Sequence, residues 1–344
     1  MLHNLVRIFG YLIFIFHPVL SLAAGDDYQI DVYRPTSTFT GTTLFADNTN
    51  RKSPKIVEVD MQGNILWSYS PPNSLFPIRR TGQNVVSDIE RLANGNTVFN
   101  IQKVGIFEVN RTGEIIWRLD DNKASHDVDR LSNGNTIYVR GWEGKGGKHV
   151  IELDPLGKEV WSWDAIPAYD RHPYIGVENQ GWIHVNAITR LSNGNTLISL
   201  RNFNTIAEIT QDGDVLRETV FPRKKMPAEK RVHLKAHPHD PELQPNDNIL
   251  VAITGINLVL EVSPSGGPPV WKWQHPTGKR PAEGVRDANR LPNGNTLIVE
   301  SSAINEITAD GELVWRLRVA NIGRQKKVLY KVQRISPDGT AYGH

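Results

Sequence analysis

Short apolar runs alternate with tight-turn signals along most of this chain, which is the pattern of β-strands joined by hairpins. The tetrapeptide Asn-Gly-Asn-Thr follows Arg-Leu and one further residue in four places, beginning at Asn94, Asn133, Asn193 and Asn293. Asn-Gly between two β-rich runs is a strong hairpin signal, because both residues tolerate positive φ. A degenerate copy spans residues 245–249. The apolar run after each turn, such as residues 196–200, is therefore predicted to be a strand.

A second element recurs out of phase with these turns. It consists of Glu, an aliphatic residue, three further residues and Gly, followed by an apolar run that often ends in Trp. The six copies begin at Glu58, Glu108, Glu152, Glu208, Glu261 and Glu306, and the tryptophans are Trp67, Trp117, Trp161, Trp271 and Trp315. Each repeat therefore holds four short strands, which is the content of one propeller blade. The sequence predicts an all-β fold, a six-bladed β-propeller, with the tryptophans packed between blades.

The two ends of the chain are predicted to meet in one blade. Six Glu elements are present, but only five turns are preceded by an inner strand. Residues 332–340 match residues 188–196 position by position, so the C-terminal strand supplies the missing inner strand. It is expected to pair with the strand at residues 42–46. Closing the ring in this way removes sheet edges that would otherwise favour aggregation.

The first 24 residues are predicted to be a signal peptide. Arg7 is the only charged residue among them, and an apolar run at residues 8–22 ends in Ala23 and Ala24. Residues 25–344 then form the propeller domain, exported to the periplasm or secreted. An uncleaved membrane anchor is the alternative. Later apolar stretches are too short to cross a bilayer, so no membrane span is expected after signal removal.

Composition excludes several classes of function. The 344 residues contain no cysteine, which rules out disulfides, thiolate metal sites and cysteine nucleophiles. Lys and Arg number 39 against 37 Asp and Glu, which leaves a formal charge of +2. Nucleic-acid binding needs a clustered basic surface, and this balance gives no support for it. Nothing in the sequence indicates an oligomeric state.

Polar residues recur where the inner strands are expected to line the central channel. Seven residues before the turn asparagine lie Ser87, His126, Asn186, His239, Arg286 and, in the C-terminal strand, Tyr330; nine before it lie His184 and His237. Because strand side chains alternate with period 2, the residues at these two positions of one strand are expected to share a face. Asp127 and Asp240 follow two of the histidines, where they either orient an imidazole or cap the strand. A histidine at such a position also commonly bonds a loop and has no chemical role.

The repeats and three further motifs resemble the arylsulfate sulfotransferase family, whose members are six-bladed periplasmic propellers. The resemblance covers most of residues 41–340. The motifs are Ser125-His126-Asp127, Trp182-Ile-His184-Val-Asn186 with a downstream Ser199-Leu-Arg201, and His239-Asp240 followed by Leu243. In the family, the histidine of the last motif is transiently sulfated.

The resemblance implies sulfuryl transfer from a small aromatic sulfate to a phenol, without PAPS or another cofactor and without a metal. His239 would attack sulfur and hold the sulfuryl group, since a neutral imidazole is a nucleophile. Arg201 and His184 would stabilise the charged oxygens, and His126 would exchange the proton between phenols. The residues expected to bind substrate are Asn186, His237, Arg286 and Tyr330.

Three departures from the family pattern stand beside this prediction. The characterised bacterial enzymes have an additional N-terminal domain, for which residues 25–40 leave no room. They also contain a disulfide, which a chain without cysteine lacks. Finally, His237 and His239 are both candidate nucleophiles, and the register of the repeat favours His239.

Two other functions remain open from the residues alone. A small propeller can bind a glycan or a protein on one face, and the long inserts at residues 162–186 and 218–240 are candidate sites. A metal-dependent lyase or hydrolase is the second alternative, because three neutral imidazoles are good ligands for zinc or copper.

Overall fold

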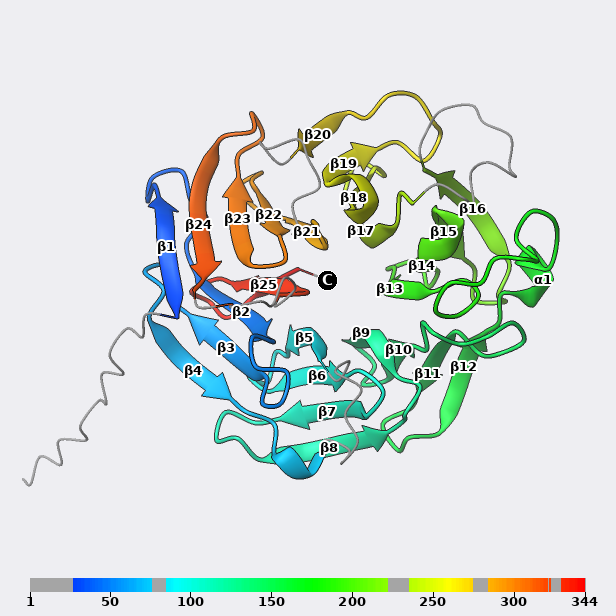
Figure 1. Cartoon of the computed structure of the whole chain (residues 1–344), viewed down its shortest axis with the longest axis horizontal. Coiled ribbons are helices and arrows are strands. Elements are labelled where there is room, and N and C mark those ends of the chain that lie inside the picture. The colour runs from blue at the N-terminus through cyan, green and yellow to red at the C-terminus, as the bar shows by residue number, and fades with distance from the viewer. Residues whose placement is uncertain are drawn as a thin grey trace, which may run out of the picture.

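A computed structural model describes residues 27–75, 85–221, 235–274, 284–320, 322 and 329–343. The predicted signal peptide lies outside these residues. Six antiparallel sheets surround a central channel, as Figure 1 shows. The predicted all-β six-bladed propeller is therefore confirmed. Among the described residues, no helix has the length and apolar composition that crossing a bilayer requires.

Each blade runs from an inner strand at the channel to an outer strand at the rim. Blade 1 contains β25 (Val332–Ile335), β2 (Thr42–Asp47), β3 (Lys55–Val59) and β4 (Ile65–Tyr69), with β26 (Ala341–Tyr342) beside β25. Blade 2 contains β5 (Val86–Arg91), β6 (Thr97–Ile101), β7 (Gly105–Val109) and β8 (Ile115–Asp120). Blade 3 contains β9 (Ser125–Arg130), β10 (Thr136–Val139), β11 (Val150–Leu153) and β12 (Glu159–Trp163).

The second half of the ring repeats this order. Blade 4 contains β13 (Val185–Arg190), β14 (Thr196–Leu200), β15 (Thr205–Ile209) and β16 (Val215–Val220). Blade 5 contains β17 (Pro238–Leu243), β18 (Ile249–Ile253), β19 (Leu258–Val262) and β20 (Trp271–Gln274). Blade 6 contains β21 (Asp287–Arg290), β22 (Thr296–Val299), β23 (Ala303–Ile307) and β24 (Leu313–Val319), with β1 (Tyr28–Tyr33) outside β24. The short helices are α1 (Ile166–Tyr169) and the 3-10 turns η1 (Asn73–Leu75), η2 (Arg201–Phe203) and η3 (Thr254–Ile256).

The repeated turns join the inner strand of a blade to the next strand outward. In blade 2 the amide of Gly95 donates to the carbonyl of Leu92, and Gly95 has a φ of 86°. The asparagine before it keeps a negative φ, unlike in the two-residue turn that Asn-Gly often forms. Its side chain instead accepts from the amide of Asn96 at 2.9 Å. The hairpin is as expected, and the glycine alone supplies the left-handed conformation.

A Trp–Arg–Glu contact joins neighbouring blades, which confirms the predicted role of the tryptophans. In blade 5, Trp271 lies under the guanidinium of Arg290 from blade 6, 4.9 Å from its ring centre. Arg290 also pairs with Glu261 of blade 5 at 2.8 Å. The same contact recurs for Arg91 on Trp67, Arg130 on Trp117, Arg190 on Trp161 and Arg334 on Trp315. Each such cation–π contact contributes about 0.5–2 kcal/mol.

One blade boundary uses a different contact. Between blades 4 and 5 the arginine position holds Leu243 and the tryptophan position holds Arg217. Arg217 pairs with Glu208 at 2.5 Å and with Asp247 at 2.9 Å. The glutamate of blade 4 thus keeps a guanidinium partner, supplied from its own blade.

Both ends of the chain contribute to closing the ring. β25 pairs with β2, with Ile335 opposite Thr42 and Val332 opposite Phe45, as predicted. The sequence pattern did not predict that β1 adds a fifth strand to blade 6, where Tyr28 lies opposite Val319. β1 covers the outer edge of β24, and Trp315 there is fully buried.

Candidate active site

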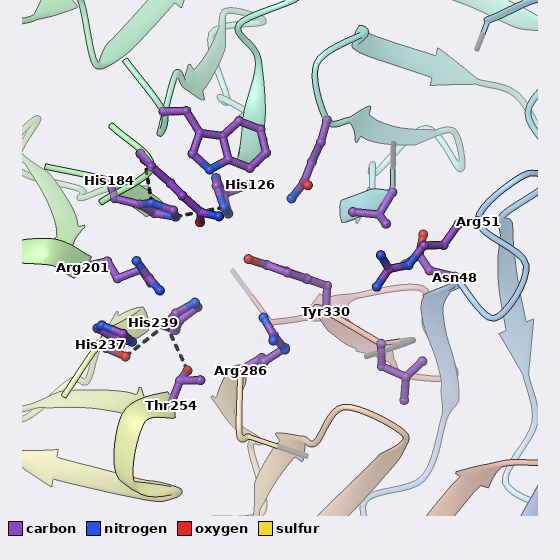
Figure 2. Close-up of a pocket in the computed structure, with 15 residues that line it drawn as sticks. Asn48, Arg51, His126, His184, Arg201, His237, His239, Thr254, Arg286 and Tyr330 are labelled. Carbon is purple, nitrogen blue, oxygen red and sulfur yellow. Dashed lines mark hydrogen bonds between the residues drawn. The ribbon is translucent and has the colours of Figure 1, made fainter. Parts of the chain in front are cut away.

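A cavity of about 350 Å³ lies at one end of the channel, within the size range of ligand pockets. All six blades contribute to its wall. The lining residues are Asn48, Arg51, Val85, Gln102, His126, Trp142, Gln180, His184, Arg201, His237, His239, Thr254, Arg286, Leu329 and Tyr330. Figure 2 shows the histidines and Arg201 on one side, Asn48 and Arg51 on the other, with Tyr330 between them; the histidines are His126, His184, His237 and His239.

The structure brings every predicted site residue to this wall except Asn186. That side chain is buried, and its amide oxygen accepts from the hydroxyl of Ser199. Pairing of β13 with β14 shifts register between Val185 and Ile188, and His184 has a φ of 53°. The period-2 alternation does not extend across this bulge. His184 therefore turns into the cavity without Asn186.

Similar irregularities occur where other inner strands meet the cavity. β9 shifts register beside His126, which has a φ of 28°, and β17 shifts after His239. His237 has a φ of 54°. Each positive φ in a non-glycine residue costs about 1–3 kcal/mol, and such strain clusters at functional sites. Bulges re-aim side chains that a regular strand would point elsewhere.

The hydrogen bonds of His239 define which ring nitrogen is available. Its Nδ1 atom lies 3.1 Å from the carbonyl oxygen of His237 and 3.0 Å from the hydroxyl of Thr254. That hydroxyl gives its own hydrogen to the carbonyl of Val285 at 2.6 Å. Both neighbours therefore accept, so Nδ1 carries the hydrogen and Nε2 keeps its lone pair. His239 is oriented as an Nε2 nucleophile.

His126 and His184 form a hydrogen-bonded pair of imidazoles. The Nδ1 atom of His184 donates to the carbonyl of Gln180 at 2.9 Å, so its Nε2 is an acceptor. The Nε2 atom of His126, 3.3 Å away, donates to it. The Nδ1 atom of His126 is buried and has no hydrogen-bond partner among the described residues. The edge of Trp142 packs on the same ring, with centroids 4.6 Å apart.

The imidazoles of His126, His184 and His239 are neutral at physiological pH. Burial, and next the positive charge of Arg201, lowers the pKa of His184 from 6.5 to about 3. Burial and the facing His184 hold the pKa of His126 well below its usual range. For His239 the causes are burial and then Arg286. A neutral imidazole is the form that attacks sulfur or binds a proton.

Positive charge dominates the cavity wall. Arg51, Arg201 and Arg286 line it, and none of the lining residues in the described part of the chain is acidic. The guanidinium of Arg286 lies 4.9 Å from the ring centre of Tyr330. Arg201 donates to the side-chain oxygen of Asn202 at 3.0 Å, which holds its guanidinium in place. The cavity is electrostatically suited to an anion.

The aspartates that follow the histidines tie neighbouring strands together. Asp127 accepts from the backbone amide of Ile188 in the next blade at 2.6 Å and pairs with Lys331 at 2.6 Å. Asp240 pairs with the same lysine at 3.0 Å. These contacts, with the next blade and with a lysine, differ from both roles considered from the sequence, which were to orient an imidazole and to cap the strand.

Sequence reasoning missed several residues of the site. Trp142, Gln180 and Arg51 lie in connections of unequal length, which the turn-based alignment of the repeats does not reach. Thr254 lies eight residues after the turn asparagine of its blade, the repeat position that Gln102 and Arg201 occupy in blades 2 and 4. Lys331 likewise occupies the repeat position of Asp127 and Asp240, six residues before the turn. That alignment was available in the sequence.

The geometry offers the cavity histidines no ready-made metal site. Among the described residues, Asp88, Asp127 and Asp129 form the one group of three or more acidic or imidazole side chains whose ligand atoms lie within 4.8 Å of one another. The lysine described above pairs with two of these acids. The imidazoles of the cavity are not part of this group.

Comparison with known proteins identifies the family. The arylsulfotransferase (ASST) family model matches residues 29–217, more than half of the chain. The protein belongs to this family. His239, Arg286 and Tyr330 lie beyond the matched segment, so their place in the site rests on the geometry. No curated protein sequence matches the chain.

Solved structures share the fold at low sequence identity. A protein of unknown function from Bacteroides caccae is 14% identical with a TM-score of 0.58, over 85% of this chain and 98% of that one. A streptogramin B lyase is also 14% identical, with a TM-score of 0.53, over 93% of this chain and 96% of the lyase. At this identity the likeness extends to the propeller fold alone.

Proposed function

We propose that the protein transfers a sulfuryl group from an aryl sulfate to a phenol through a sulfohistidine at His239. The observation that carries this proposal is the orientation of His239, whose Nδ1 hydrogen is held by two acceptors so that Nε2 remains a nucleophile. Family membership and the guanidinium-rich wall support the same reaction.

In the first half-reaction the Nε2 lone pair of His239 attacks sulfur. The N–S bond forms as the bond from sulfur to the aryl oxygen breaks, and the phenolate leaves with that electron pair. Arg201 and Arg286 offset the negative charge on the sulfuryl oxygens, as cations do in phosphoryl transfer. An aryl sulfate carries its own leaving group, so no nucleotide or other cofactor is required.

The pair formed by His126 and His184 handles the proton. An anionic substrate between the arginines offsets their positive charge, and this lets the pair bind one proton from solvent. The pair gives that proton to the departing phenolate. In the second half-reaction the acceptor phenol returns a proton to the pair while its oxygen attacks sulfur, and the N–S bond breaks. When the product leaves, the pair releases this proton to solvent, and the imidazoles are again in their starting state.

The reaction is proposed to take place outside the cytoplasm. Residues 1–24 have the charge, apolar run and small residues of a signal peptide. Aryl sulfates and phenols are small aromatic compounds that an exported enzyme meets directly.

Release of p-nitrophenol from p-nitrophenyl sulfate, with and without added phenol, tests the proposal. We expect acceptor-dependent release, parallel lines in double-reciprocal plots, and a sulfuryl adduct on His239 detectable by mass spectrometry. His239→Ala should abolish both release and adduct. His237→Ala is the matched control, because it removes the other candidate nucleophile and should retain the adduct. Intersecting lines, or an adduct that survives in His239→Ala, contradict the proposed mechanism.

A binding function is the second candidate, favoured by another cavity. It measures about 490 Å³ and is lined by residues of the connection before β13 together with Lys235 and His237. It thus lies in the two inserts expected to bind a glycan or protein, of which residues 222–234 lie outside the described residues. Folded protein that releases no p-nitrophenol with any acceptor favours this function.

A further inference from the structure

The side chain of Lys331 crosses the channel beneath the cavity. The residues six before each turn asparagine are Asp88, Asp127, Ala187, Asp240, Asp287 and Lys331, taken from blade 2 round to the inner strand of blade 1. Each of these positions directly follows the one that supplies the cavity with His126, His239, Arg286 and Tyr330. Contacts made by the side chains at this repeat position therefore act on the backbone next to the reactive side chains.

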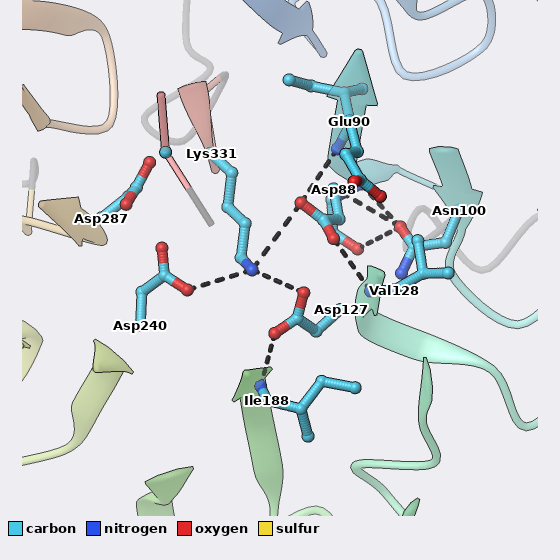
Figure 3. A network of polar contacts seen from close by, with 12 residues as sticks. Asp88, Glu90, Asn100, Asp127, Val128, Ile188, Asp240, Asp287 and Lys331 are labelled. Atoms are coloured by element: carbon cyan, nitrogen blue, oxygen red, sulfur yellow. Dashed lines mark hydrogen bonds and ion pairs between the residues drawn. The ribbon is translucent and has the colours of Figure 1, made fainter. Parts of the chain in front are cut away.

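Lys331 is the centre of the network shown in Figure 3. Its ammonium lies 2.6 Å from a carboxylate oxygen of Asp127, 3.0 Å from Asp240 and 3.7 Å from Asp88. The lysine side chain is only 2% exposed, and the three carboxylates are 0–7% exposed. One cation from blade 1 thus reaches blades 2, 3 and 5.

Two of the three carboxylates, those of Asp88 and Asp127, are themselves fixed to a neighbouring strand, and Asp240 lies within β17. Asp88 accepts from the amide of Val128 in blade 3 at 2.8 Å, and Asp127 from Ile188 in blade 4 at 2.6 Å. Asp287 accepts in the same way from the amide of Val332 at 2.9 Å. A movement of Lys331 is therefore transmitted to the inner strands and not absorbed by loose side chains.

Lys331 keeps its positive charge at neutral pH. Burial alone lowers the pKa of a lysine, but Asp127, Asp240 and Asp88 outweigh it and raise the pKa of Lys331 well above 10.5. Buried charges of this kind are tolerated only with close partners and good hydrogen bonds. The network is rigid for the same reason, because any displacement leaves a charge unpaired.

We propose that Lys331 is a positioning residue for sulfuryl transfer, holding β9 and β17 at the separation that places His126 and His239 on opposite sides of the transferred group. The inference rests on the proposed function. The arm through Asp240 acts on the nucleophile, and the arm through Asp127 acts on the proton-handling pair. Asp88 belongs to the same network, but Ser87 before it does not line the cavity.

Three isosteric variants separate the arms. Asp240→Asn is expected to slow formation of the sulfuryl adduct in single turnover by about 100-fold, the effect of a displacement near 1 Å, with little change in KM. Asp127→Asn should slow turnover of phenyl sulfate far more than of p-nitrophenyl sulfate, because only the poorer leaving group needs a proton. Asp88→Asn keeps an oxygen that can accept from the amide of Val128 and loses only the longest contact of Lys331, at 3.7 Å, so kcat should stay near that of wild type. Equal loss of kcat in all three variants overturns the proposal.

Removal of the lysine has its own matched control. Lys331→Gln leaves the carboxylates without their cation, so the protein is at risk of misfolding. Arg334→Gln is three residues further along, in β25, and removes another buried cation, which pairs with Glu306 at 3.3 Å and faces blade 6. Both variants should lower Tm, but the Arg334 variant should keep the kcat of wild type per folded molecule. Loss of kcat to the same extent in both counts against a positioning role.

A readout without turnover distinguishes failure of the inference from failure of the proposed function. In ¹³C-labelled protein, the histidine ring resonance of His239 should shift in Asp240→Asn and that of His126 in Asp127→Asn, with neither shifting in Asp88→Asn. If the variants show this pattern of shifts but the wild-type protein transfers no sulfuryl group, the proposed function fails and the positioning role stands. If the resonances do not move, the positioning is overturned whatever the activity.

Discussion

The Nε2 atoms of His126 and His184 lie 3.3 Å apart, and only one hydrogen is shared between them. The Nδ1 atom of His184 donates to the carbonyl of Gln180, and the Nδ1 atom of His126 is buried without a partner among the described residues. A second proton on the pair must go to a nitrogen that has no acceptor. The free protein therefore keeps this pair neutral.

We expect the free energy of unfolding to fall as the pH drops from 6.5 to 5. An unfolded histidine titrates near 6.5, whereas folded His184 titrates near 3, so the unfolded chain binds more protons in this interval. Each such imidazole lowers the free energy of unfolding by about 1.4 kcal/mol for every pH unit below 6.5. Burial raises the pKa of Glu242 to about 7, which opposes the trend, but His126 and His239 add to that of His184. Urea unfolding at several pH values measures the slope.

His184→Gln supplies the control for this slope. It removes one imidazole buried in neutral form, so the pH dependence should decrease by about one proton. A wild-type protein of constant stability between pH 6.5 and 5 contradicts the neutral burial of these residues.

Thr254 is expected to act on the rate through the tautomer of His239. Its hydroxyl is one of the two acceptors that hold the hydrogen on Nδ1. Thr254→Val keeps the shape but removes this acceptor, so kcat should fall about tenfold, which corresponds to about 1.4 kcal/mol for one hydrogen bond. Thr254→Ser retains the hydroxyl and should stay near wild type. Steady-state kinetics with p-nitrophenyl sulfate compare the two, and equal rates for both variants count against a role for the hydroxyl.

The fold was predictable because its signals are local and repeated. Each Asn-Gly turn and each Glu-to-Trp element reports on its own hairpin, and the match of residues 332–340 to an inner strand predicted the closure. The site was predictable in part. The imidazoles recur at two repeat positions, but the bulge that separates Asn186 from His184 depends on pairing with β14. Alternation along a single strand carries no information on such a bulge.

Other parts of the site depend on contacts that cross the ring. Trp142 and Gln180 reach the cavity from connections without a repeat, so no alignment places them. Lys331 shares the position of four aspartates, and a comparison of those positions predicts opposite charges at one level of the channel. Only the structure shows that this lysine spans the channel and reaches blades 3 and 5.

The contact between Arg290 and Trp271 should stabilise the boundary of blades 5 and 6. Arg290→Ala removes a cation–π contact and leaves the buried Glu261 without its cationic partner, so the free energy of unfolding should fall by about 2 kcal/mol. Arg318→Ala is the control, because that arginine is 42% exposed and its pair with Asp31 contributes little. Urea unfolding compares them. Equal losses mean that stacking on Trp271 adds nothing to an ordinary surface ion pair.

Removal of residues 328–344 should abolish cooperative folding, because that segment supplies the inner strand of blade 1. Without β25, β2 loses four paired positions and the ring opens at the channel. The same deletion takes away Lys331 and Arg334, which leaves the acids of the channel and Glu306 without their cations. Circular dichroism should show no sharp thermal transition. A truncated protein that melts like the full chain contradicts closure by the C-terminal strand.

The fifth strand of blade 6 provides the comparison for that deletion. β1 lies at the outer edge of the ring, where blade 6 keeps four strands without it. Removal of residues 27–33 exposes Trp315 and breaks the hydrogen bond of Tyr28 to Asp47, but no blade loses its inner strand. This variant should lower Tm and still unfold in one transition, because the channel and its network remain closed. If this variant, like the C-terminal deletion, shows no sharp thermal transition, then pairing at the rim contributes as much to closure as pairing at the channel.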